Sequence, residues 1–567
     1  MSEPLQRDLN RLSTQTFDLL VVGGGIFGIC AAWDAVLRGL EVALIEACDF
    51  GHGASANCFK MVHGGIRYLQ HGDVYRLRHS ARERKILLQI APHLVKPLPV
   101  VVPTYGHGKE GKEFLGVGIK LYDWLTMDRN RGVDDPARQV PSGSFLSRNE
   151  VLADFPGLEQ KGLTGAAKFY DGQMYNTARL VLAFLRSATT AGLCAANYVR
   201  AQKILTKGGQ VSGVDAVDEL TGDAVTIHAR TIINASGGWS EALLGRSGGL
   251  QPAKPSTFSR DACFIVPRIF DSPCALAAEG RTKDPDAILS RSARHLFIVP
   301  WRQYSLVGVW HVVDRGSADE VRVSEADLQG FLDEINGAYP ALQLTHSDVN
   351  LWNAGQVLFG ENAPEQVNLS YGKRSRMIDH WKTHQLQGLV TLIGVRYTTA
   401  RVDAIDAVNL VVKKLQRKAP AGATASRRVF GGAIDDIRAS TRQAVADFPT
   451  VNPDIMDGVV QNYGSEYRQV MNRGSSVEDL QLITGTHTLI AEVRYAARQE
   501  MAMRLDDVVM RRTDMGSGEY PGRAALEQTA ALLAQELSWS PVQQRQEITR
   551  TLQHYEKLTL RELTEQN

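Results

Sequence analysis

Three glycines near the amino terminus have the spacing that holds the pyrophosphate of a dinucleotide. An apolar segment, residues 17–22, runs into a G-x-G-x-x-G turn, and residues 29–39 then read as a helix. Gly23 permits a tight turn, Gly25 lets the backbone approach the phosphates, and Gly28 lets the helix pack on the strand. The amino terminus of the helix then faces the phosphate charge. The cofactor contacts predicted in this turn are Gly23, Gly25, Ile26, Phe27 and Gly28.

An acidic side chain stands where such a fold needs a partner for the ribose. The next apolar segment, residues 41–45, ends on Glu46. An acid about 20 residues after the glycines can accept a hydrogen bond from a ribose hydroxyl. A glycine-rich turn alone is a weak signal. Strand, turn, helix and acid together predict a bound dinucleotide rather than a turn that binds nothing.

A second strand end offers room beside the cofactor. Residues 231–235 form an apolar run that ends on Ser236, Gly237 and Gly238. Small side chains let the backbone approach a ligand closely, so we predict cofactor contacts at Ser236 and Gly237. Strand-to-glycine turns are common, and this signal is weak by itself.

The bulk composition excludes several other functions. Lys plus Arg number 63 and Asp plus Glu number 62, so no strongly basic surface points to nucleic acid. The six cysteines are scattered without a C-x-x-C pair, which argues against a zinc site or a disulfide framework. We therefore expect no bound metal and a reducing compartment. A length of 567 residues favours two or more domains.

No segment predicts a membrane span. The first 15 residues are polar, without the apolar stretch of a signal peptide, and no apolar run has the length of a transmembrane helix. We expect a cytoplasmic protein. Peripheral contact with the inner face of a membrane stays open, as does a homodimer.

These chemical groups need elements that position them. Helical patterns cover residues 73–90 and 177–191, and a strand-glycine-helix return spans 388–415. The middle of the chain is rich in strands, which predicts a mixed sheet that walls a substrate pocket. The predicted strands there are 262–267, 295–300 and 305–312. After a linker at 418–426, the predicted helices include 454–462, 465–473, 488–503 and 524–537.

The segment 55–69 carries a resemblance to a known family. It contains His63-Gly64-Gly65-Ile66-Arg67-Tyr68-Leu69, which resembles the H-G-G-x-R-Y-L segment of FAD-dependent glycerol-3-phosphate dehydrogenases. Further likenesses follow in the family's order along nearly the whole chain. They lie at residues 91–94, 169–173, 178–180, 234–239, 430–434 and 505–513. Ordered matches over this length are highly specific.

The resemblance implies an α/β fold with a glutathione-reductase-like FAD-binding Rossmann domain, an interleaved mixed-sheet substrate domain and a C-terminal helical cap domain. We place the FAD-binding domain at 16–415, with its substrate part mainly at 93–170 and 252–380, and the helical domain at 427–567. The family implies oxidation of a secondary alcohol by hydride transfer to FAD, with the electrons passed to a quinone or to oxygen. The flavin supplies the chemistry, and the protein supplies position and charge.

The resemblance also implies which residues hold the cofactor and the substrate. In the matching segments, FAD contacts are expected at Ser55, Lys60, His63, Gly65, Gly394 and Thr398. Arg67 and Tyr68 match part of a phosphate clamp, and Arg396 stands where the family has a lysine. Guanidinium groups suit phosphate oxygens, so the positive charge is kept while its shape changes.

Three positions depart from the family in the expected substrate pocket. An arginine of the family's S-G-V-R-P-L is missing from residues 353–358, which read Asn-Ala-Gly-Gln-Val-Leu. A family histidine falls at Cys263, and the last residue of the family's G-T-T-D falls at His311. Lys373, Arg374 and Arg376 could replace the missing arginine, although a charge run is usually a solvated face. Either the pocket is rebuilt around the same substrate or the substrate differs.

Three residues are candidates for the catalytic step. His63 or His311 could accept the hydroxyl proton because imidazole titrates near neutral pH, although a lone histidine is more often structural. Arg396 follows a glycine turn beside the expected flavin ring. The leading function is oxidation of glycerol 3-phosphate or a related anionic polyol. An FAD-dependent hydroxy-acid or amine oxidase is the alternative, and a scaffold that keeps FAD without catalysis is the third.

Overall fold

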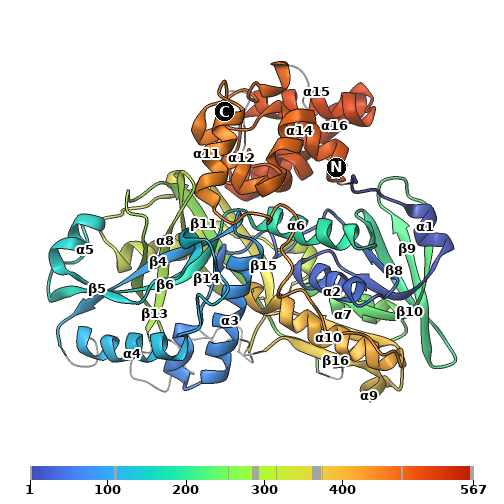
Figure 1. Ribbon diagram of the computed structural model, residues 1–567, viewed down its shortest axis with the longest axis horizontal. Helices are drawn as coiled ribbons and strands as arrows, with labels where there is room; N and C mark the ends of the chain where they lie inside the picture. Colours follow the sequence, from blue (N-terminus) through green and yellow to red (C-terminus); the bar gives the residue numbers. More distant parts are fainter. Residues whose placement is uncertain are drawn as a thin grey trace.

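The chain folds into two sheets that lie side by side beneath a layer of helices (Figure 1). The computed structural model describes residues 3–107, 111–252, 254–283, 293–314, 316–360, 372, 374–473, 477–561 and 563. Within these ranges, no helix combines the length and the apolar character needed to cross a membrane.

The first sheet is mostly parallel, and its central strand leads into the glycine turn. Every residue of β1 (Thr16–Val22) after Thr16 is buried, as expected of a strand that is covered on both faces. β1 pairs in parallel with β2 (Val42–Ile45) and with β10 (Ala224–Asn234). The other strands are β7 (Cys194–Ala196), β8 (Val199–Lys207), β9 (Gln210–Asp218), β16 (Arg376–Asp379) and β17 (Leu389–Ile393). The order is β16-β17-β10-β1-β2-β7, and β9 and β8 extend from β10.

Four predicted cofactor residues follow the parallel strands of this sheet. Gly23 follows β1, Glu46 follows β2, Ser236 comes after β10, and Gly394 follows β17. The carboxyl ends of parallel strands meet at one edge, where open α/β sheets bind their ligands. The topology therefore gathers residues that are far apart in the sequence.

Helices cover one face of the first sheet, and the strands β8 and β9 with two short helices cover the other. α2 (Ile26–Leu37), which begins in the glycine turn, packs against α10 (Ala400–Lys414) and α6 (Thr177–Thr190). The Trp33 ring of α2 meets the Phe184 ring of α6 edge to face at 5.3 Å. The smaller helices on this sheet are α1 (Leu9–Thr14), α7 (Ser240–Arg246) and α9 (His380–His384).

The second sheet is mixed and forms the other half of the molecule. Its strands run in the order β15-β11-β14-β13-β12-β4-β6-β3, and β5 pairs with β6. They are β3 (Met61–Val62), β4 (Val95–Tyr105), β5 (Ser144–Ser147), β6 (Leu163–Met174), β11 (Phe258–Pro267), β12 (Ala275–Lys283), β13 (Ala293–Trp301), β14 (Tyr304–Asp314) and β15 (Leu351–Leu358). Around this sheet lie α3 (Val74–Ile90), α4 (Lys112–Leu125), α5 (Arg148–Asp154) and α8 (Glu325–Ala338).

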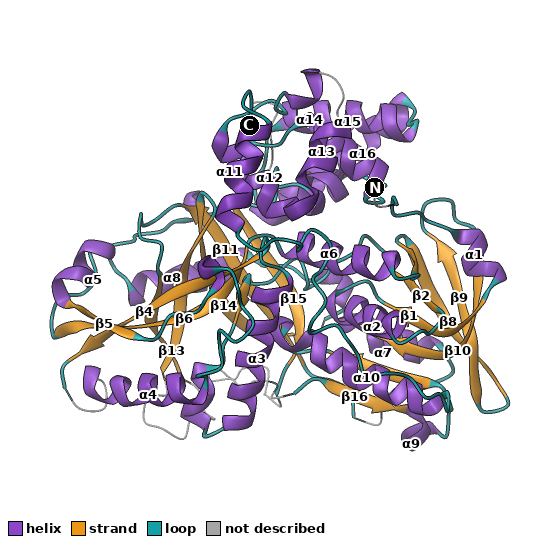
Figure 2. Ribbon diagram, in the orientation of Figure 1, coloured by secondary structure: helices purple, strands orange, loops and turns teal. Residues whose placement is uncertain are grey.

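The last part of the chain is a helical cap. Figure 2 shows helices without strands above both sheets, where the carboxyl terminus also lies. They are α11 (Ile437–Asp447), α12 (Pro453–Tyr463), α13 (Tyr467–Arg473), α14 (Ile490–Gln499), α15 (Arg523–Leu537) and α16 (Pro541–Thr559). Among the described residues, one π-helical segment, η10 (Asp507–Arg512), connects α14 to α15.

The predicted architecture is confirmed: an α/β unit with a mostly parallel sheet, a mixed second sheet and a C-terminal helical domain. One predicted helix is too long, because α14 ends at Gln499 rather than near residue 503. The reason is local: Met501 has φ 53°, a left-handed conformation that ends a right-handed helix. The exact domain limits stay a prediction.

Candidate active site

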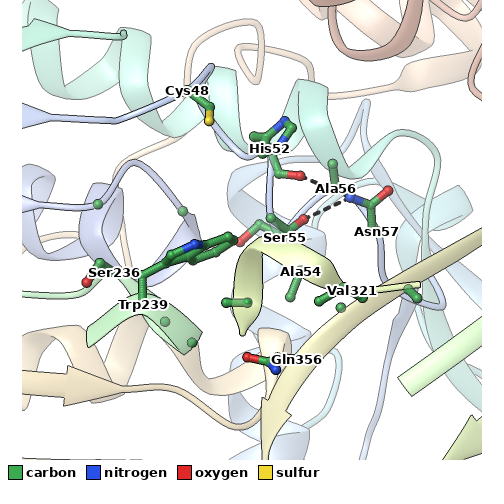
Figure 3. Close-up of a pocket in the computed structure, with 18 of the residues that line it drawn as sticks. Cys48, His52, Ala54, Ser55, Ala56, Asn57, Ser236, Trp239, Val321 and Gln356 are labelled. Carbon is green, nitrogen blue, oxygen red and sulfur yellow. Dashed lines mark hydrogen bonds between the residues drawn. The ribbon is translucent and has the colours of Figure 1, made fainter. Parts of the chain in front are cut away.

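A cavity of about 1670 Å³ lies where the first sheet, the second sheet and the cap meet. Figure 3 shows part of its wall, with Ser236 and Trp239 on one side and the Ser55 loop beside them. The predicted cofactor residues that line it are Gly23, Gly25, Ile26, Phe27, Glu46, Ser55, Lys60, Ser236, Gly237 and Gly394. One cavity thus joins residues from five separate segments of the chain.

In the glycine turn, backbone atoms lie as close to the glycines as the sequence predicts. Gly23 has φ 112°, and a Cβ there would lie 2.6 Å from the Ala235 carbonyl oxygen. A Cβ on Gly28 would lie 2.0 Å from the Gly23 carbonyl oxygen, so α2 can pack on β1 only with glycine at this position. The Ile26 amide donates to Ser55 Oγ at 3.0 Å, which joins the turn to the segment 55–69.

The Glu46 carboxylate is fixed at the end of β2. Its Oε2 accepts a hydrogen bond from the Gly24 amide at 2.6 Å, and its Oε1 accepts one from the Cys48 amide at 2.9 Å. Burial raises the pKa of Glu46, while these two backbone donors act in the opposite direction. Each oxygen keeps a second lone pair, so the group can also accept from a ribose.

Lys60 adds a buried amine to the lining of the cavity. Its Nζ donates to the Cys58 carbonyl oxygen at 3.4 Å and lies 4.9 Å from the centre of the Trp301 ring. Burial lowers the pKa of Lys60. Trp352 also lines the cavity, and its buried Nε1 has no hydrogen-bond partner in the described part of the chain. Donors such as these, in one cavity with the glycine turn, fit the polar edge of a flavin and the pyrophosphate of FAD.

The predicted substrate residues form a second group, outside the residues that line the cavity. Arg396 Nη1 donates to the Tyr68 hydroxyl at 2.7 Å, and its guanidinium lies 5.3 Å from the centre of the Tyr68 ring. The Arg76 guanidinium lies 4.8 Å from the same ring. Arg67 is exposed on the neighbouring 3₁₀ turn, η1 (Ile66–His71). The structure thus joins Tyr68 to Arg396 across 328 residues of sequence.

Of the three residues predicted to replace the missing arginine, the structure describes Arg374 and Arg376. Arg376 donates to Ser256 Oγ and to the Lys254 carbonyl oxygen, each at 2.7 Å. Lys373 lies outside the described residues. Arg374 is exposed, and its guanidinium lies 5.9 Å from the centre of the Tyr75 ring on α3. No described contact joins Arg374 to the Tyr68–Arg396 pair.

His63 is held by a carboxylate. Its Nδ1 lies 3.1 Å from Asp171 Oδ2, and the Gly64 amide donates to Asp171 Oδ1 at 2.6 Å. Burial opposes the charge of Asp171, but the bonds from His63 and Gly64 and the charge of Arg84 lower its pKa. The His63 amide donates to Thr398 Oγ1 at 3.1 Å, which ties it to the segment that carries Arg396. The His63 side chain is 53% exposed, so substrate can reach it.

Gly65, the last predicted cofactor residue outside the cavity, caps η1. Its φ of 85° is left-handed, and a Cβ there would lie 3.0 Å from Tyr68 Cδ2. Glycine at this position therefore lets η1 fold back over the start of α3.

His311 also pairs with a carboxylate, on the second sheet. Its Nδ1 lies 2.8 Å from Asp261 Oδ1, and Ser259 Oγ donates to the same oxygen. The His311 ring stacks on Phe359 with centroids 6.1 Å apart. The pairing of β11 with β14 brings His311 opposite Asp261, so the dyad depends on strand register.

The departures from the family pattern lie together on the second sheet. Cys263 on β11 pairs with Gly308 on β14 and with Asn353 on β15. Burial raises the pKa of Cys263 to about 12, so its thiol stays protonated at neutral pH. Gln356 Nε2 donates to the Gly316 carbonyl oxygen at 3.1 Å. Neutral groups thus stand at the two positions where the resemblance implies an arginine and a histidine.

Sequence reasoning missed the contribution of the cap to the cavity. Arg511 and His554 line it, on η10 and on α16. Asp49 accepts hydrogen bonds from Arg512 Nη1 at 2.6 Å and from Arg511 Nε at 2.7 Å. The D-D-x-x-x-R-R-T likeness at 505–513 was the available signal, but its partner Asp49 carries no motif.

Comparison with known families divides the chain in two. Residues 18–357 match the family described as FAD dependent oxidoreductase. Residues 423–544 match the family described as C-terminal domain of alpha-glycerophosphate oxidase. The first match includes strands of both sheets, and the second lies mainly in the helical cap.

Two known relatives match this chain over nearly its whole length. A glycerol-3-phosphate dehydrogenase of Synechocystis sp. is 30% identical, over 95% of this chain and 96% of that protein. Glycerol-3-phosphate dehydrogenase 2 of Mycobacterium bovis is 30% identical, over 95% of this chain and 88% of that protein.

Among solved structures, the fold matches glycerol-3-phosphate dehydrogenase from Bacillus halodurans complexed with FAD. The TM-score is 0.76 at 22% identity, and the match covers 99% of each chain. The chain is therefore an FAD-dependent oxidoreductase of the glycerol-3-phosphate dehydrogenase family.

Proposed function

We propose that this enzyme oxidises the secondary alcohol of glycerol 3-phosphate or of a related phosphorylated or anionic polyol. The observation that carries the proposal is the pair of Arg396 and Tyr68, with Arg67 on the same turn as Tyr68. This cationic group belongs to the two segments, 55–69 and 394–398, that also line the cofactor cavity. An anion held there would place its neighbouring alcohol carbon beside the flavin.

The residues of the cavity would hold FAD in a defined orientation. The glycine turn with Ile26 and Phe27 would bind the pyrophosphate, and Glu46 the ribose. Ser55, Lys60 and Gly394 would contact the flavin end, and Ser236 and Gly237 would leave room for the chain between the two ends. Bound FAD supplies the hydride acceptor for the alcohol carbon.

The protein would supply orientation and a proton acceptor. Arg67, Tyr68 and Arg396 would fix the anion by charge-assisted hydrogen bonds. His63 would accept the hydroxyl proton at its Nε2, because Asp171 holds Nδ1 and so fixes the ring tautomer. His311 is the second candidate base, with Asp261 in the corresponding position. The electrons would pass on to a quinone or to oxygen.

One observation favours a second candidate, an FAD-dependent hydroxy-acid or amine oxidase. Asn353 and Gln356 line the cavity without a charge, and Cys263, which pairs with Asn353, is buried beside them. Gln356 donates to the Gly316 carbonyl oxygen. Losing one charge-assisted contact to a buried phosphate costs about 2–3 kcal/mol, or about 30- to 100-fold in binding. A smaller or less charged substrate would not need that contact.

The first test is an anaerobic visible spectrum of the holoenzyme with sn-glycerol 3-phosphate. Bleaching of the oxidised flavin supports the leading function. The flavin could instead stay oxidised with polyol phosphates and bleach with hydroxy acids or amino acids. That result would favour the second candidate function.

Arg396 gives the sharper test of the site. Arg396→Ala should raise the KM for the anionic substrate by about 30- to 100-fold because it removes a charge-assisted contact, and Arg396→Lys should recover part of this loss. Arg438→Ala, an exposed arginine on the cap, is the matched control. Equal kinetics for Arg396→Ala and the control would show that the anion binds elsewhere.

A further inference from the structure

The helix α3 packs against three segments of the candidate site. It contacts η1, the turn of Arg67 and Tyr68, and η7 (Tyr397–Thr399), which directly follows Arg396. It also contacts β6, the strand of Asp171. Figure 1 places α3 near the middle of the molecule, where the halves built on the two sheets meet. A single helix thus touches the elements of both the proposed base and the anion-binding group.

Two adjacent residues of α3 are buried charges. Glu83 and Arg84 are each 1% exposed. A buried charge is costly unless it is paired, and the two residues have partners on different elements. Glu83 pairs with Arg401 on α10, and Arg84 pairs with Asp171 on β6. Neighbouring residues of a helix point about 100° apart, so α3 can reach both elements from one turn.

Arg84 lies directly behind the proposed base. Its Nη1 is 3.4 Å from Asp171 Oδ1, the oxygen that also accepts from the Gly64 amide. The other oxygen, Oδ2, contacts His63 Nδ1. A Cβ on Gly64 would lie 2.3 Å from Arg84 Nη1 and 2.2 Å from the Tyr122 hydroxyl oxygen. Both side chains therefore pack against the residue next to His63, and the carboxylate between them is held at both oxygens.

The surroundings of Asp171 keep it ionised. The ionisable groups that face it come from three elements: His63 before η1, Arg84 on α3 and Tyr122 on α4. Burial opposes the charge of Asp171, but His63, Arg84 and the Gly64 amide together lower its pKa. Burial raises the pKa of Tyr122 to about 12, so this hydroxyl stays neutral. At neutral pH the carboxylate is thus in the form that accepts a hydrogen bond from His63.

Glu83 holds the segment that carries Arg396. Its two oxygens accept from Arg401 Nε at 2.9 Å and from Arg401 Nη2 at 2.6 Å, a bidentate pair in the first turn of α10. Such pairs fix orientation as well as distance. Arg396 comes one short turn before that helix, and its carbonyl oxygen accepts from the Thr399 amide at 3.2 Å. The pair therefore sets where the Arg396 segment lies relative to α3.

We propose that Glu83 and Arg84 are positioning residues that set the distance between the base and the anion-binding group. Arg84 holds Asp171 in the orientation that fixes His63. Glu83 holds the start of α10, from which Arg396 reaches the anion. The proposal rests on the proposed function, because it takes His63 as the base and Arg396 as the anion contact.

The pH dependence of kcat in the holoenzyme tests the role of Arg84. Arg84→Leu removes a charge that lowers the pKa of Asp171, so the carboxylate should take up its proton at a higher pH. His63 then loses its acceptor, and kcat at pH 5 should fall about 10-fold further below its value at pH 8 than in the wild type. Arg84→Lys keeps the charge and should restore the wild-type profile. Asp171→Asn should lower kcat by about 100-fold at every pH.

The KM for the anionic substrate tests the role of Glu83. Glu83→Gln with Arg401→Gln removes both charges, so no buried charge is left unpaired. The start of α10 should shift, which should raise KM by about 10-fold with little change in kcat. Arg82→Ala, an exposed neighbour on α3, is the matched control and should change neither constant. FAD content and thermal melting are measured for every variant. If Arg84→Leu does not fold, Arg84→Lys and Asp171→Asn decide the question.

Acylation of His63 by diethyl pyrocarbonate tests the first pair without any substrate. The side chain is 53% exposed, so the reagent can reach its Nε2, and mass spectrometry of the His63 peptide gives the rate. Asp171→Asn should slow acylation because the ring loses the carboxylate at Nδ1. Arg84→Leu should approach the rate of Asp171→Asn at pH 5 and the wild-type rate at pH 8.

Two results would overturn the proposal. One is an equal rate of His63 acylation in the wild type, Asp171→Asn and Arg84→Leu. The other is a set of variants in which kcat and KM change together with FAD content, as a purely structural role would require. A wild type whose flavin no alcohol reduces contradicts the proposed function instead, and the acylation rates then still decide the role of Arg84.

Discussion

At the scale of single residues, the site places imidazoles against carboxylates. His63 pairs with Asp171, and His311 pairs with Asp261. In each pair the carboxylate holds Nδ1, so Nε2 would be the nitrogen that accepts the hydroxyl proton in the proposed reaction. Glu46 is fixed in a comparable way, by two backbone amides rather than by a side chain.

Glu46→Ala should weaken FAD binding by about 30- to 100-fold. The substitution removes the acceptor of the Gly24 and Cys48 amides together with the proposed ribose contact. Fluorescence titration of the apoprotein with FAD measures the change. Glu41→Ala, whose side chain is 61% exposed at the start of the same segment, is the control. A dissociation constant within twofold of the control would remove Glu46 from the cofactor site.

At the scale of elements, one buried carboxyl group makes the stability of the cap depend on pH. Glu492 on α14 is 3% exposed, and its Oε2 accepts from the Leu489 amide at 2.9 Å at the start of the helix. Burial raises the pKa of Glu492 to about 8. The folded protein therefore keeps a proton here that an unfolded chain, with a pKa of about 4.3, would release.

The free energy of unfolding should fall between about pH 4.3 and pH 8 through this group, because the unfolded state gives up the proton first. Glu492→Gln removes the dependence. Its stability relative to the wild type should rise by about 3 kcal/mol between pH 5 and pH 8. Urea unfolding at the two pH values measures this, with Glu527→Gln on α15, whose side chain is 51% exposed, as control. Parallel pH profiles for wild type and Glu492→Gln would contradict the assignment.

At the scale of the whole molecule, one carboxylate joins the cap to the nucleotide sheet. Asp49, three residues after Glu46, accepts from Arg511 and Arg512 of η10, and all three side chains are buried. Burial alone would raise the pKa of Asp49, but the charges of Arg512 and Arg511 lower it to about 2. The cap is thus anchored next to the residue predicted to bind the ribose.

Asp49→Asn should lower the free energy of unfolding by about 3–5 kcal/mol, because it leaves buried guanidinium groups without their counter-charge. Asp435→Asn is the control, since Asp435 is 88% exposed and its pair with Arg428 contributes about 0–1 kcal/mol. Denaturant unfolding and FAD content measure both variants.

The Asp49 contribution has a defined pH range. The folded pKa lies below the unfolded value of about 3.9, so the stabilisation is complete above that value and is lost as pH falls toward 2. Asp49→Asn should therefore unfold at nearly the same acid pH as the wild type while differing from it at pH 7. Equal stability at pH 7 would show that the cap does not depend on this anchor.

The sequence by itself determined the local part of this protein. The glycine turn, Glu46 and the strand end at Ser236 follow from spacing along short segments, because strand and helix geometry repeat every few residues. The ordered likenesses along the chain gave the family and the fold class, which the structure and the comparisons confirm.

The tertiary structure alone decided which distant side chains meet. His63 contacts Asp171, which is 108 residues away in the sequence. Tyr68 contacts Arg396, which is 328 residues away. His311 reaches Asp261 only through the register of β14 on β11. Such contacts depend on how complete elements pack, and no short-range spacing encodes them. The exposure of Val117, Leu121 and Trp124 on α4 has the same origin, because an apolar helical stripe predicts burial until packing shows which face is left uncovered.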